Sequence, residues 1–332
     1  MTTDEICADI EAHHSTHPKL KALIRSIRAS TVKKRYFSRP LDSAYVSGSA
    51  PLSERNPAAF SDAFEMAKKA VERTLKANSL TPADIDAIVT SHSTSWTVPS
   101  LDVRLAQELG FPPEISRIPM TSLACAGGAQ ALIRARDFVT AHPGKRVLIV
   151  VSETLSTTYN HEETTTPSMI FKGLFGDSAG ACIVTDTPLG SGIQIDDTWE
   201  YVVSESHDWY RSRVETSGVH FPSTREALNS IRAVKGPLLD WLGDWRPDVP
   251  VIHTGGPRII SDLVEALGLE EKAARHSCSS LEENGNLGGV AVLDVLSRTY
   301  EEPPDHGEGV LMVGFGPGFV ISSCKGSWYH SS

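Results

Sequence analysis

The sequence predicts an α/β protein, because short apolar runs of strand length alternate with amphipathic stretches of helix length throughout its 332 residues. Apolar residues make up 40% of the chain and charged residues 22%, which is sufficient for a sizeable core. Strands that alternate with helices are typical of sheets buried between helical layers. We therefore expect largely buried sheets that are covered by helices.

The clearest helix in the first half spans 57–78, where apolar residues from Phe60 to Leu75 recur at three- and four-residue steps. The next predicted helix ends before Gly110, a residue type that often terminates helices. The elements predicted here are helices at 57–78, 100–109 and 129–141, and strands at 87–89 and 146–151.

From residue 181 onward the same rhythm repeats. A Pro/Gly-rich run at 186–192 indicates a join, so we expect two halves, 1–187 and 188–332. The elements predicted in this part are strands at 181–184, 251–252 and 310–313, and helices at 230–243, 259–267 and 288–298.

Composition excludes several classes of protein. The net charge of −10 argues against a general nucleic-acid binder. The five cysteines form no C-x-x-C pair, so neither a disulfide framework nor a cysteine zinc site is predicted. The sequence has no secretory signal and no apolar run of transmembrane length, so we expect a cytoplasmic protein that does not associate with membranes. His13, His14 and His161 lack metal-ligand spacing and are interpreted as surface histidines, so no metal site is predicted.

The sharpest local motif is SLACAGGAQALIRARDF at 122–138, in which Cys125 lies in a small-residue turn just before a helix. Backbone N–H groups and the helix dipole favour negative charge at such a position. We therefore expect the pKa of the Cys125 thiol to be lowered and the thiolate to act as a nucleophile. The same turn is equally compatible with a buried structural cysteine.

Two further motifs lie at predicted loop positions. His253, in VIHTGGPRII, follows a short apolar strand, where catalytic groups of α/β proteins often lie. Asn286, in ENGNLGGVAVLDVL, lies in a glycine-flanked turn and could donate a hydrogen bond without adding charge. Taken alone, His253 is better explained as a histidine that caps a loop, and Asn286 as a helix N-cap. The GFGPGF run at 314–319 lacks dinucleotide-loop spacing and is interpreted as a rigid cavity wall.

Together and in this order, these motifs resemble the type III polyketide synthases of the chalcone synthase kind, within the thiolase-like superfamily. The resemblance runs from about Thr2 to Trp328, and the GGPRI run after His253 is similar to bacterial naphthalene-type synthases. The matching elements are KKRY at 33–36, the Cys125 turn, LFGDSAGA at 174–181, HTGGPRI at 253–259, GN at 285–286 and GFGPG at 314–318.

The resemblance implies a five-layered αβαβα thiolase-like fold of two pseudo-repeated halves that forms a homodimer. It also implies iterative decarboxylative condensation of malonyl-CoA onto an acyl-CoA starter, malonyl-CoA itself included, followed by cyclisation to a small polyphenol or pyrone. CoA thioesters would be the substrates, and no cofactor or metal would be needed. The family usually has a strand before the segment that Met1 opens, so we expect this sequence to start late.

The resemblance also assigns roles to residues. Cys125 would carry the acyl chain, with His253 and Asn286 completing the catalytic triad. Further matching positions are the gatekeeping aromatics Phe175 and Phe221, the cavity-wall residues Ser93, Thr94, Thr158 and Gly288, and the CoA-binding cations Lys21, Arg25 and Arg28. Taken without the resemblance, this basic cluster is better interpreted as a solvated helix face.

Three alternatives remain at this point. A chain-initiating ketoacyl synthase has the same fold and triad but condenses once, onto a carrier protein. A Cys-His-Asn peptide hydrolase has suitable residue types, although the surrounding motifs do not resemble papain-like enzymes. An inactive scaffold partner is disfavoured by the intact triad.

Overall fold

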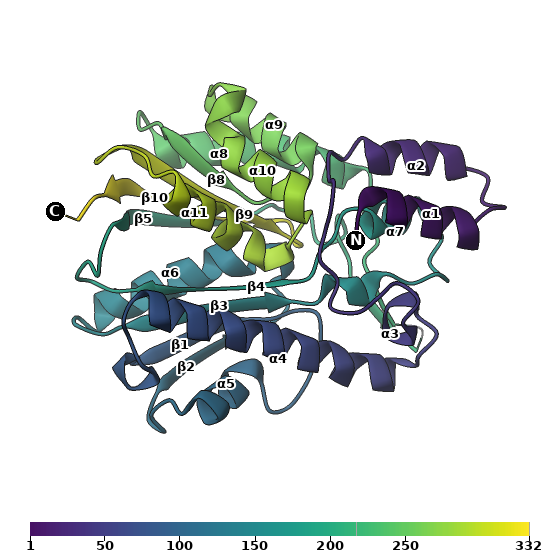
Figure 1. Cartoon of the computed structure of the whole chain (residues 1–332). Helices are drawn as coiled ribbons and strands as arrows, with labels where there is room; N and C mark the ends of the chain where they lie inside the picture. The colour runs from purple at the N-terminus through teal and green to yellow at the C-terminus, as the bar shows by residue number, and fades with distance from the viewer. Residues whose placement is uncertain (217, 332) are drawn as a thin grey trace.

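The computed structural model describes residues 1–216 and 218–331 and has five layers in the order αβαβα (Figure 1). Two four-stranded sheets enclose a middle layer of two helices, and further helices cover the outer face of each sheet. This arrangement confirms the predicted α/β class and the layered fold. From one side to the other, the helical layers are α4 (Leu52–Ala77) with α5 (Leu101–Leu109), α6 (Gly127–Ala141) with α11 (Ala291–Glu301), and α8 (Ser230–Leu242) with α9 (Pro257–Leu267).

The first sheet has its most apolar strands at the centre. Strand β1 pairs in parallel with β2 and β3, and β4 closes the edge antiparallel to β3. Every residue of the central strands β1 and β3 is buried, as expected for a sheet covered by helices on both faces. The strand order is β2 (Ser116–Met120), β1 (Ala87–Ser91), β3 (Val147–Glu153) and β4 (Ser178–Val184).

The second sheet is mixed. Strand β8 is parallel to β9, and β10 is antiparallel to both of its neighbours, with an irregularity in its pairing to β5 between Lys325 and Gly326. A separate hairpin joins β6 (Arg213–Glu215) to β7 (Gly218–His220). The order in the sheet is β5 (Gly192–Val202), β10 (Val320–Tyr329), β9 (Gly309–Gly316) and β8 (Val249–Ile252).

Additional helices lie around one end of the layers and have a small core of their own, which includes Ile6, Ile10 and Met169 (Figure 1). Helix α10 (Arg275–Asn284) packs between α9 and α11. Within the described ranges, no helix is both long and apolar enough to cross a bilayer. The helices at this end are α1 (Thr3–His13), α2 (Leu20–Arg28), α3 (Ala44–Ser47) and α7 (Thr166–Lys172). Short 3₁₀ turns occur throughout the described chain: η1 (Pro82–Asp84), η2 (Ala124–Ala126), η3 (Leu155–Thr158), η4 (Glu226–Asn229), η5 (Glu271–Ala274) and η6 (Gly288–Val290).

The predicted elements are present, with shifted boundaries. Helix α4 begins at Leu52, five residues before the predicted start, and Pro57 lies inside it. The helix predicted at 288–298 is formed by the 3₁₀ turn η6 followed directly by α11, and Gly288, its first residue, has a left-handed φ of +60° that lies outside the α-helical range. The division of the chain at residue 187 stays a prediction.

Helix α6 and the turn η6 approach each other closely in the middle layer. A Cβ added to Gly128 would lie 2.1 Å from the backbone oxygen of Gly289, and one added to Gly289 would lie 2.9 Å from the backbone oxygen of Ala124. Only glycine permits this approach of two backbones. The contact matters for function because Cys125 lies just before α6 and Asn286 just before η6.

We predict that Gly128→Ala destabilises the protein by about 1–3 kcal/mol, the usual cost of overpacking a rigid core. Gly236→Ala is the matched control, because Gly236 also lies in a helix, α8, but its added Cβ would meet nothing within 4 Å. Chemical denaturation of both variants measures the difference. Equal stability of the two variants would contradict the close backbone contact.

Candidate active site

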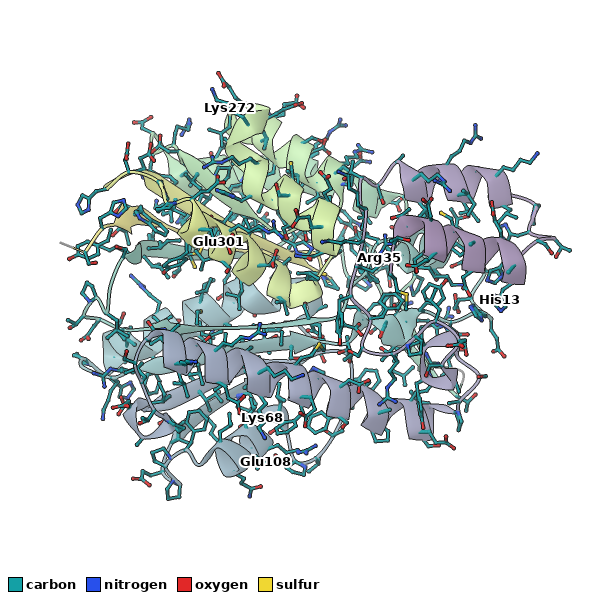
Figure 2. The ribbon with its side chains drawn as sticks, in the orientation of Figure 1. His13, Arg35, Lys68, Glu108, Lys272 and Glu301 are labelled. Carbon is teal, nitrogen blue, oxygen red and sulfur yellow. The ribbon has the colours of Figure 1, made fainter. Side chains whose placement is uncertain are left out.

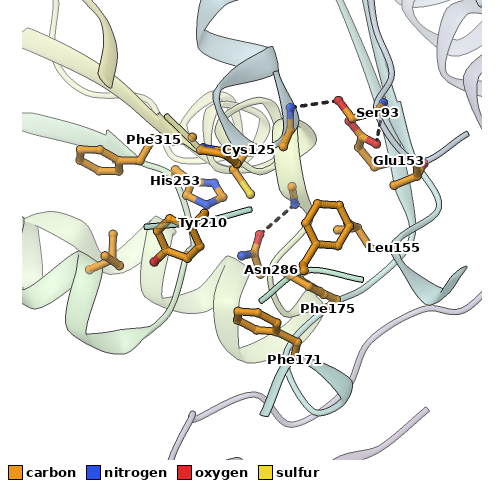
Figure 3. A pocket seen from close by; sticks show the side chains of 18 of the residues that line it. Ser93, Cys125, Glu153, Leu155, Phe171, Phe175, Tyr210, His253, Asn286 and Phe315 are labelled. Carbon is orange, nitrogen blue, oxygen red and sulfur yellow. Dashed lines mark hydrogen bonds between the residues drawn. The ribbon is translucent and has the colours of Figure 1, made fainter. Parts of the chain in front are cut away.

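A cavity of about 840 Å³, including its open mouth, lies at the ends of strands β1, β3 and β8 (Figure 3). It brings together eight of the residues that the sequence analysis selected, and these come from six separate segments of the chain. These are Ser93, Thr94, Cys125, Phe175, Phe221, His253, Asn286 and Gly288.

Cys125 lies in η2, immediately before α6, as the sequence motif predicted. The turn is tight: Ala124 has a φ of +47°, and its N–H donates a hydrogen bond to Oγ of Ser93 at 2.9 Å. Small residues are required beneath it, since a Cβ on Gly127 would lie 2.1 Å from Oγ of Ser91. A strained backbone at a nucleophile persists only where the surroundings hold it in place. The surrounding chain therefore fixes the direction of the Cys125 thiol.

His253 follows β8 directly. Its backbone N–H donates to the carbonyl of Val313 at 2.9 Å, which extends the pairing of β8 with β9 by one residue. The side chain is buried, with 3% of the residue exposed. Burial lowers the pKa of His253 to about 4, although a hydrogen bond with the backbone of Gly288 acts in the opposite direction. The imidazole is therefore neutral at physiological pH.

Asn286 is fixed by its backbone and its side chain. Its N–H donates to the carbonyl of Leu174 at 2.8 Å, and its carbonyl accepts from the N–H of Gly176 at 3.0 Å. The side-chain Oδ1 accepts from the N–H of Gly288 at 2.9 Å (Figure 3). With Oδ1 occupied, the NH₂ group is the part of the amide that remains to donate to a ligand in the cavity.

The charge state of Cys125 differs from the sequence-based expectation. Burial raises the pKa of the thiol to about 12, and the nearby carboxylate of Glu153 adds to this effect. A hydrogen bond from the Asn286 side chain favours the thiolate but does not compensate. The predicted lowering of the pKa is therefore wrong: the helix N-terminus lies where expected, but desolvation outweighs it. The site at rest holds a neutral thiol beside a neutral imidazole.

Glu153 is a cavity residue that the sequence analysis missed. It ends β3 and is almost fully buried, and its Oε2 accepts the N–H of Ser93 at 3.1 Å. Burial raises the pKa of Glu153 to about 8, although hydrogen bonds from Ser93 and Thr94 lower it. The sequence did contain a signal for Glu153: a carboxylate lies two residues after the apolar run RVLIVV at 146–151. A charged group at the end of a buried strand requires a partner or a function.

The remaining walls of the cavity are mostly apolar and aromatic. Phe175 stacks on Phe171 with 5.0 Å between the ring centroids, and Phe315 stacks on Phe319 at 5.8 Å. The predicted aromatics Phe175 and Phe221 thus have companions that the sequence did not single out. Those additional lining residues are Leu155, Phe171, Tyr210 and Ile259, whereas Phe315 and Phe319 belong to the GFGPGF run that was predicted to form a cavity wall.

Two groups of predicted residues lie elsewhere. Thr158 is not part of the cavity lining, because it ends η3 with its hydroxyl donating to the carbonyl of Leu155, and Leu155 lines the cavity instead. Lys21, Arg25 and Arg28 are exposed on α2, which packs against α7, the helix that carries Phe171. Arg28 forms an ion pair with Asp4 at 2.7 Å. Their role in binding CoA stays a prediction.

Residues 3–188 match the family model of the N-terminal domain of chalcone and stilbene synthases. The chain is 30% identical to 1,3,6,8-tetrahydroxynaphthalene synthase of Streptomyces coelicolor, over 99% of this chain and 88% of that protein. It is 29% identical to phloroglucinol synthase of Pseudomonas fluorescens, over 99% of this chain and 95% of that protein.

Solved structures agree with the sequence comparison. The crystal structure of the S. coelicolor tetrahydroxynaphthalene synthase, a bacterial type III polyketide synthase, superposes with a TM-score of 0.95 at 30% identity, covering 100% of this chain and 96% of the other. Germicidin synthase, also from S. coelicolor, gives a TM-score of 0.93 at 26% identity, with 99% and 96% coverage. The family model, the relatives and the five-layered fold agree with the assembled site: the chain belongs to the chalcone and stilbene synthase family and is a type III polyketide synthase, an acyltransferase that forms carbon–carbon bonds by Claisen-type condensation.

Proposed function

We propose that this enzyme extends an acyl chain held on Cys125 by successive decarboxylative condensations with malonyl-CoA. The observation that carries the proposal is that Cys125, His253 and Asn286 line one largely apolar cavity. The product would be a small polyphenol or pyrone, and malonyl-CoA would be a candidate starter as well as the extender. These specifics are supported by the relatives, which are named for tetrahydroxynaphthalene and phloroglucinol synthesis.

Loading begins with a proton transfer. Burial favours the neutral forms of both groups and so opposes a thiolate–imidazolium pair at rest. The Cys125 thiol therefore passes its proton to His253 only when a bound thioester is in position to be attacked. The thiolate attacks the thioester carbonyl, while His253 and the NH₂ group of Asn286 donate hydrogen bonds to the developing oxyanion. CoA leaves as its thiol with the proton from His253, and the acyl group remains on sulfur.

Extension uses the same two donors. The bond between the carboxylate carbon and the methylene carbon of malonyl-CoA breaks, and CO₂ leaves. The electron pair of that bond forms an enolate, whose oxygen accepts hydrogen bonds from His253 and Asn286. The enolate carbon then attacks the acyl group on Cys125, and the cysteine thiolate leaves. Decarboxylation supplies the carbanion, so the proposed reaction needs neither a metal nor a nicotinamide.

The aromatic walls protect these intermediates. Water would protonate the enolate and hydrolyse the acyl-cysteine, so the site must exclude it. Phe175 and Phe221 line the cavity beside the triad, and the stacked pair of Phe171 and Phe175 leaves little freedom for the rings. We assign Ser93, Thr94 and Gly288 to starter and product selection, because they line the same space.

CoA would approach from the side of α2, where Lys21, Arg25 and Arg28 offer positive charge to its phosphates. Support comes from the packing of α2 on α7, which connects this face to the cavity residue Phe171. We further propose a homodimer, supported by the exposed apolar side chains of Trp96 and Val98 close to Thr94 in the sequence. A cytoplasmic location is proposed from the five free cysteines.

The test is incubation with isotopically labelled malonyl-CoA, alone and with a panel of acyl-CoA starters, followed by mass spectrometry. We expect products with two or more malonate-derived units from the wild type and from Cys278→Ala, and none from Cys125→Ala. Cys278 is an exposed cysteine outside the cavity and is therefore the matched control. A single condensation that requires a carrier protein would instead indicate a chain-initiating ketoacyl synthase.

We predict that Asn286→Ala lowers the rate of malonyl-CoA decarboxylation by about a hundredfold or more, because one oxyanion donor is lost. Acylation of Cys125 should persist at a reduced rate, because His253 still donates to the oxyanion, and it can be followed by the mass of the intact protein. Asn78→Ala, at the exposed end of α4, controls for loss of an amide. Unchanged product formation by Asn286→Ala would remove Asn286 from the proposed role.

We predict that Glu153→Gln lowers the pKa of Cys125, because a carboxylate beside the thiol opposes formation of the thiolate. The pH profile of Cys125 alkylation by iodoacetamide should shift to lower pH. Glu301→Gln, on the exposed face of α11 (Figure 2), should leave the profile unchanged. A profile that is identical in Glu153→Gln and the wild type would contradict the electrostatic coupling.

A further inference from the structure

Helix α1 and the segment after η3 bring three potential metal ligands together outside the active-site cavity. Asp9 and His13 are four residues apart on one face of α1, and His161 approaches them from residues 159–161. Their ligand atoms all lie within 4.8 Å of one another. The segments that supply them are about 150 residues apart in sequence, so no spacing motif marks the group (Figure 2 labels His13).

The distances within the group fit a zinc ion. Nε2 of His161 lies 2.8 Å from Oδ2 of Asp9, and Nδ1 of His13 lies 3.3 Å from Oδ1 of the same carboxylate. Zinc–ligand bonds of about 2.0–2.1 Å in a tetrahedron place neighbouring ligand atoms roughly 3.3 Å apart. The ligand atoms are therefore close enough to share one ion once the side chain of His13 has rotated toward it.

The side chains of Asp9 and His161 are held in position, whereas the ring of His13 must turn. The imidazole rings of His13 and His161 stack at 3.8 Å between centroids with 17° between their planes, and because the nitrogen lone pairs lie in the ring planes, His13 has to rotate out of the stack to share an ion with His161. The backbone N–H of His161 donates to the carbonyl of Ser47 at 2.9 Å, and the hydroxyl of Tyr159 donates to Oδ2 of Asp9 at 2.6 Å. Such hydrogen bonds to a ligating carboxylate are typical of metal sites.

We propose that Asp9, His13 and His161 bind Zn²⁺ and that the ion fastens the end of α1 to the segment that follows η3. Burial differs across the group: the side chains of Asp9 and His161 are 13% and 18% exposed, and that of His13 is 48% exposed. The exposed side admits the ion and leaves a position for water. The connection is relevant to the active site because Leu155, in η3, lines the cavity.

Two neighbouring contacts reduce the affinity of this group of residues for zinc. Nδ1 of His13 contacts the backbone carbonyl of Asp9 at 2.9 Å and must leave it to bind the ion. Lys172, whose Nζ lies 3.2 Å from Nε2 of His14, is a neighbouring cation, although burial lowers its pKa to about 8. The site should therefore bind zinc more weakly than a closed site with four protein ligands.

The experiment is calorimetric titration of the chelator-treated full chain with Zn²⁺, together with the change in Tm on adding zinc. We expect one ion per chain and a zinc-dependent rise in Tm, because a ligand that binds only the folded state stabilises it. His161→Ala and His13→Ala should each lower the affinity by about a hundredfold or more, since even the loss of an outer hydrogen-bonding partner costs roughly 10–100-fold.

His142→Ala is the matched control. Nδ1 of His142 contacts the carbonyl of Phe138, four residues earlier, just as Nδ1 of His13 contacts that of Asp9, but Phe138 offers no ligand. This variant should bind zinc like the wild type. Because a variant can lose stability by itself, the comparison uses the zinc-dependent part of the Tm. Absence of zinc binding by the wild type, or equal zinc binding by His161→Ala, would overturn the proposal. Substitution of Co²⁺ for Zn²⁺ gives a spectroscopic check: a thiolate charge-transfer band would indicate a cysteine ligand and would also overturn the proposal.

Discussion

The contact between the backbones of Gly128 and Gly289 is the constraint on which the active site depends. It allows α6 and η6 to cross without side chains between them, so that two segments from different halves of the chain end side by side. Cys125 precedes one segment and Asn286 the other, and a larger residue at either glycine would separate nucleophile and donor. The small residues around both motifs are thus a packing requirement as well as a catalytic one.

Desolvation governs the chemistry that this contact assembles. A helix N-terminus stabilises a negative charge by about 0.3–1 kcal/mol, which is less than one pKa unit. Full burial can shift a pKa by about 3–5 units, so the enclosed cavity determines the resting charge of Cys125, His253 and Glu153. The same apolar walls that raise the cost of charge also exclude water, which carbanion chemistry requires.

Local pattern predicted most of the fold. Helix α4, strands β1 and β3 and the turn at Cys125 were all placed correctly because their periodicity and punctuation are local properties of the chain. Element boundaries shifted where the backbone geometry differed from the regular pattern, as at Gly288, whose left-handed φ lies at the start of the predicted helix, so that α11 begins only at Ala291. Thr158 shows the limit for side chains: it lies close to Leu155 in the sequence, yet only Leu155 faces the cavity, and the 3₁₀ turn η3 determines which one does.

The sequence by itself determined the fold class, the family and the residues most suited to the chemistry, because motif identity and order are written along the chain. The tertiary structure decided what those residues meet. It placed Glu153 beside Cys125 and reversed the expected direction of the thiol pKa. It also brought His161 close to Asp9 and His13. In the sequence, His13 and His161 are far apart and were interpreted as surface histidines that bind no metal. Both outcomes depend on burial and on contacts between distant segments, and neither quantity is encoded in local spacing.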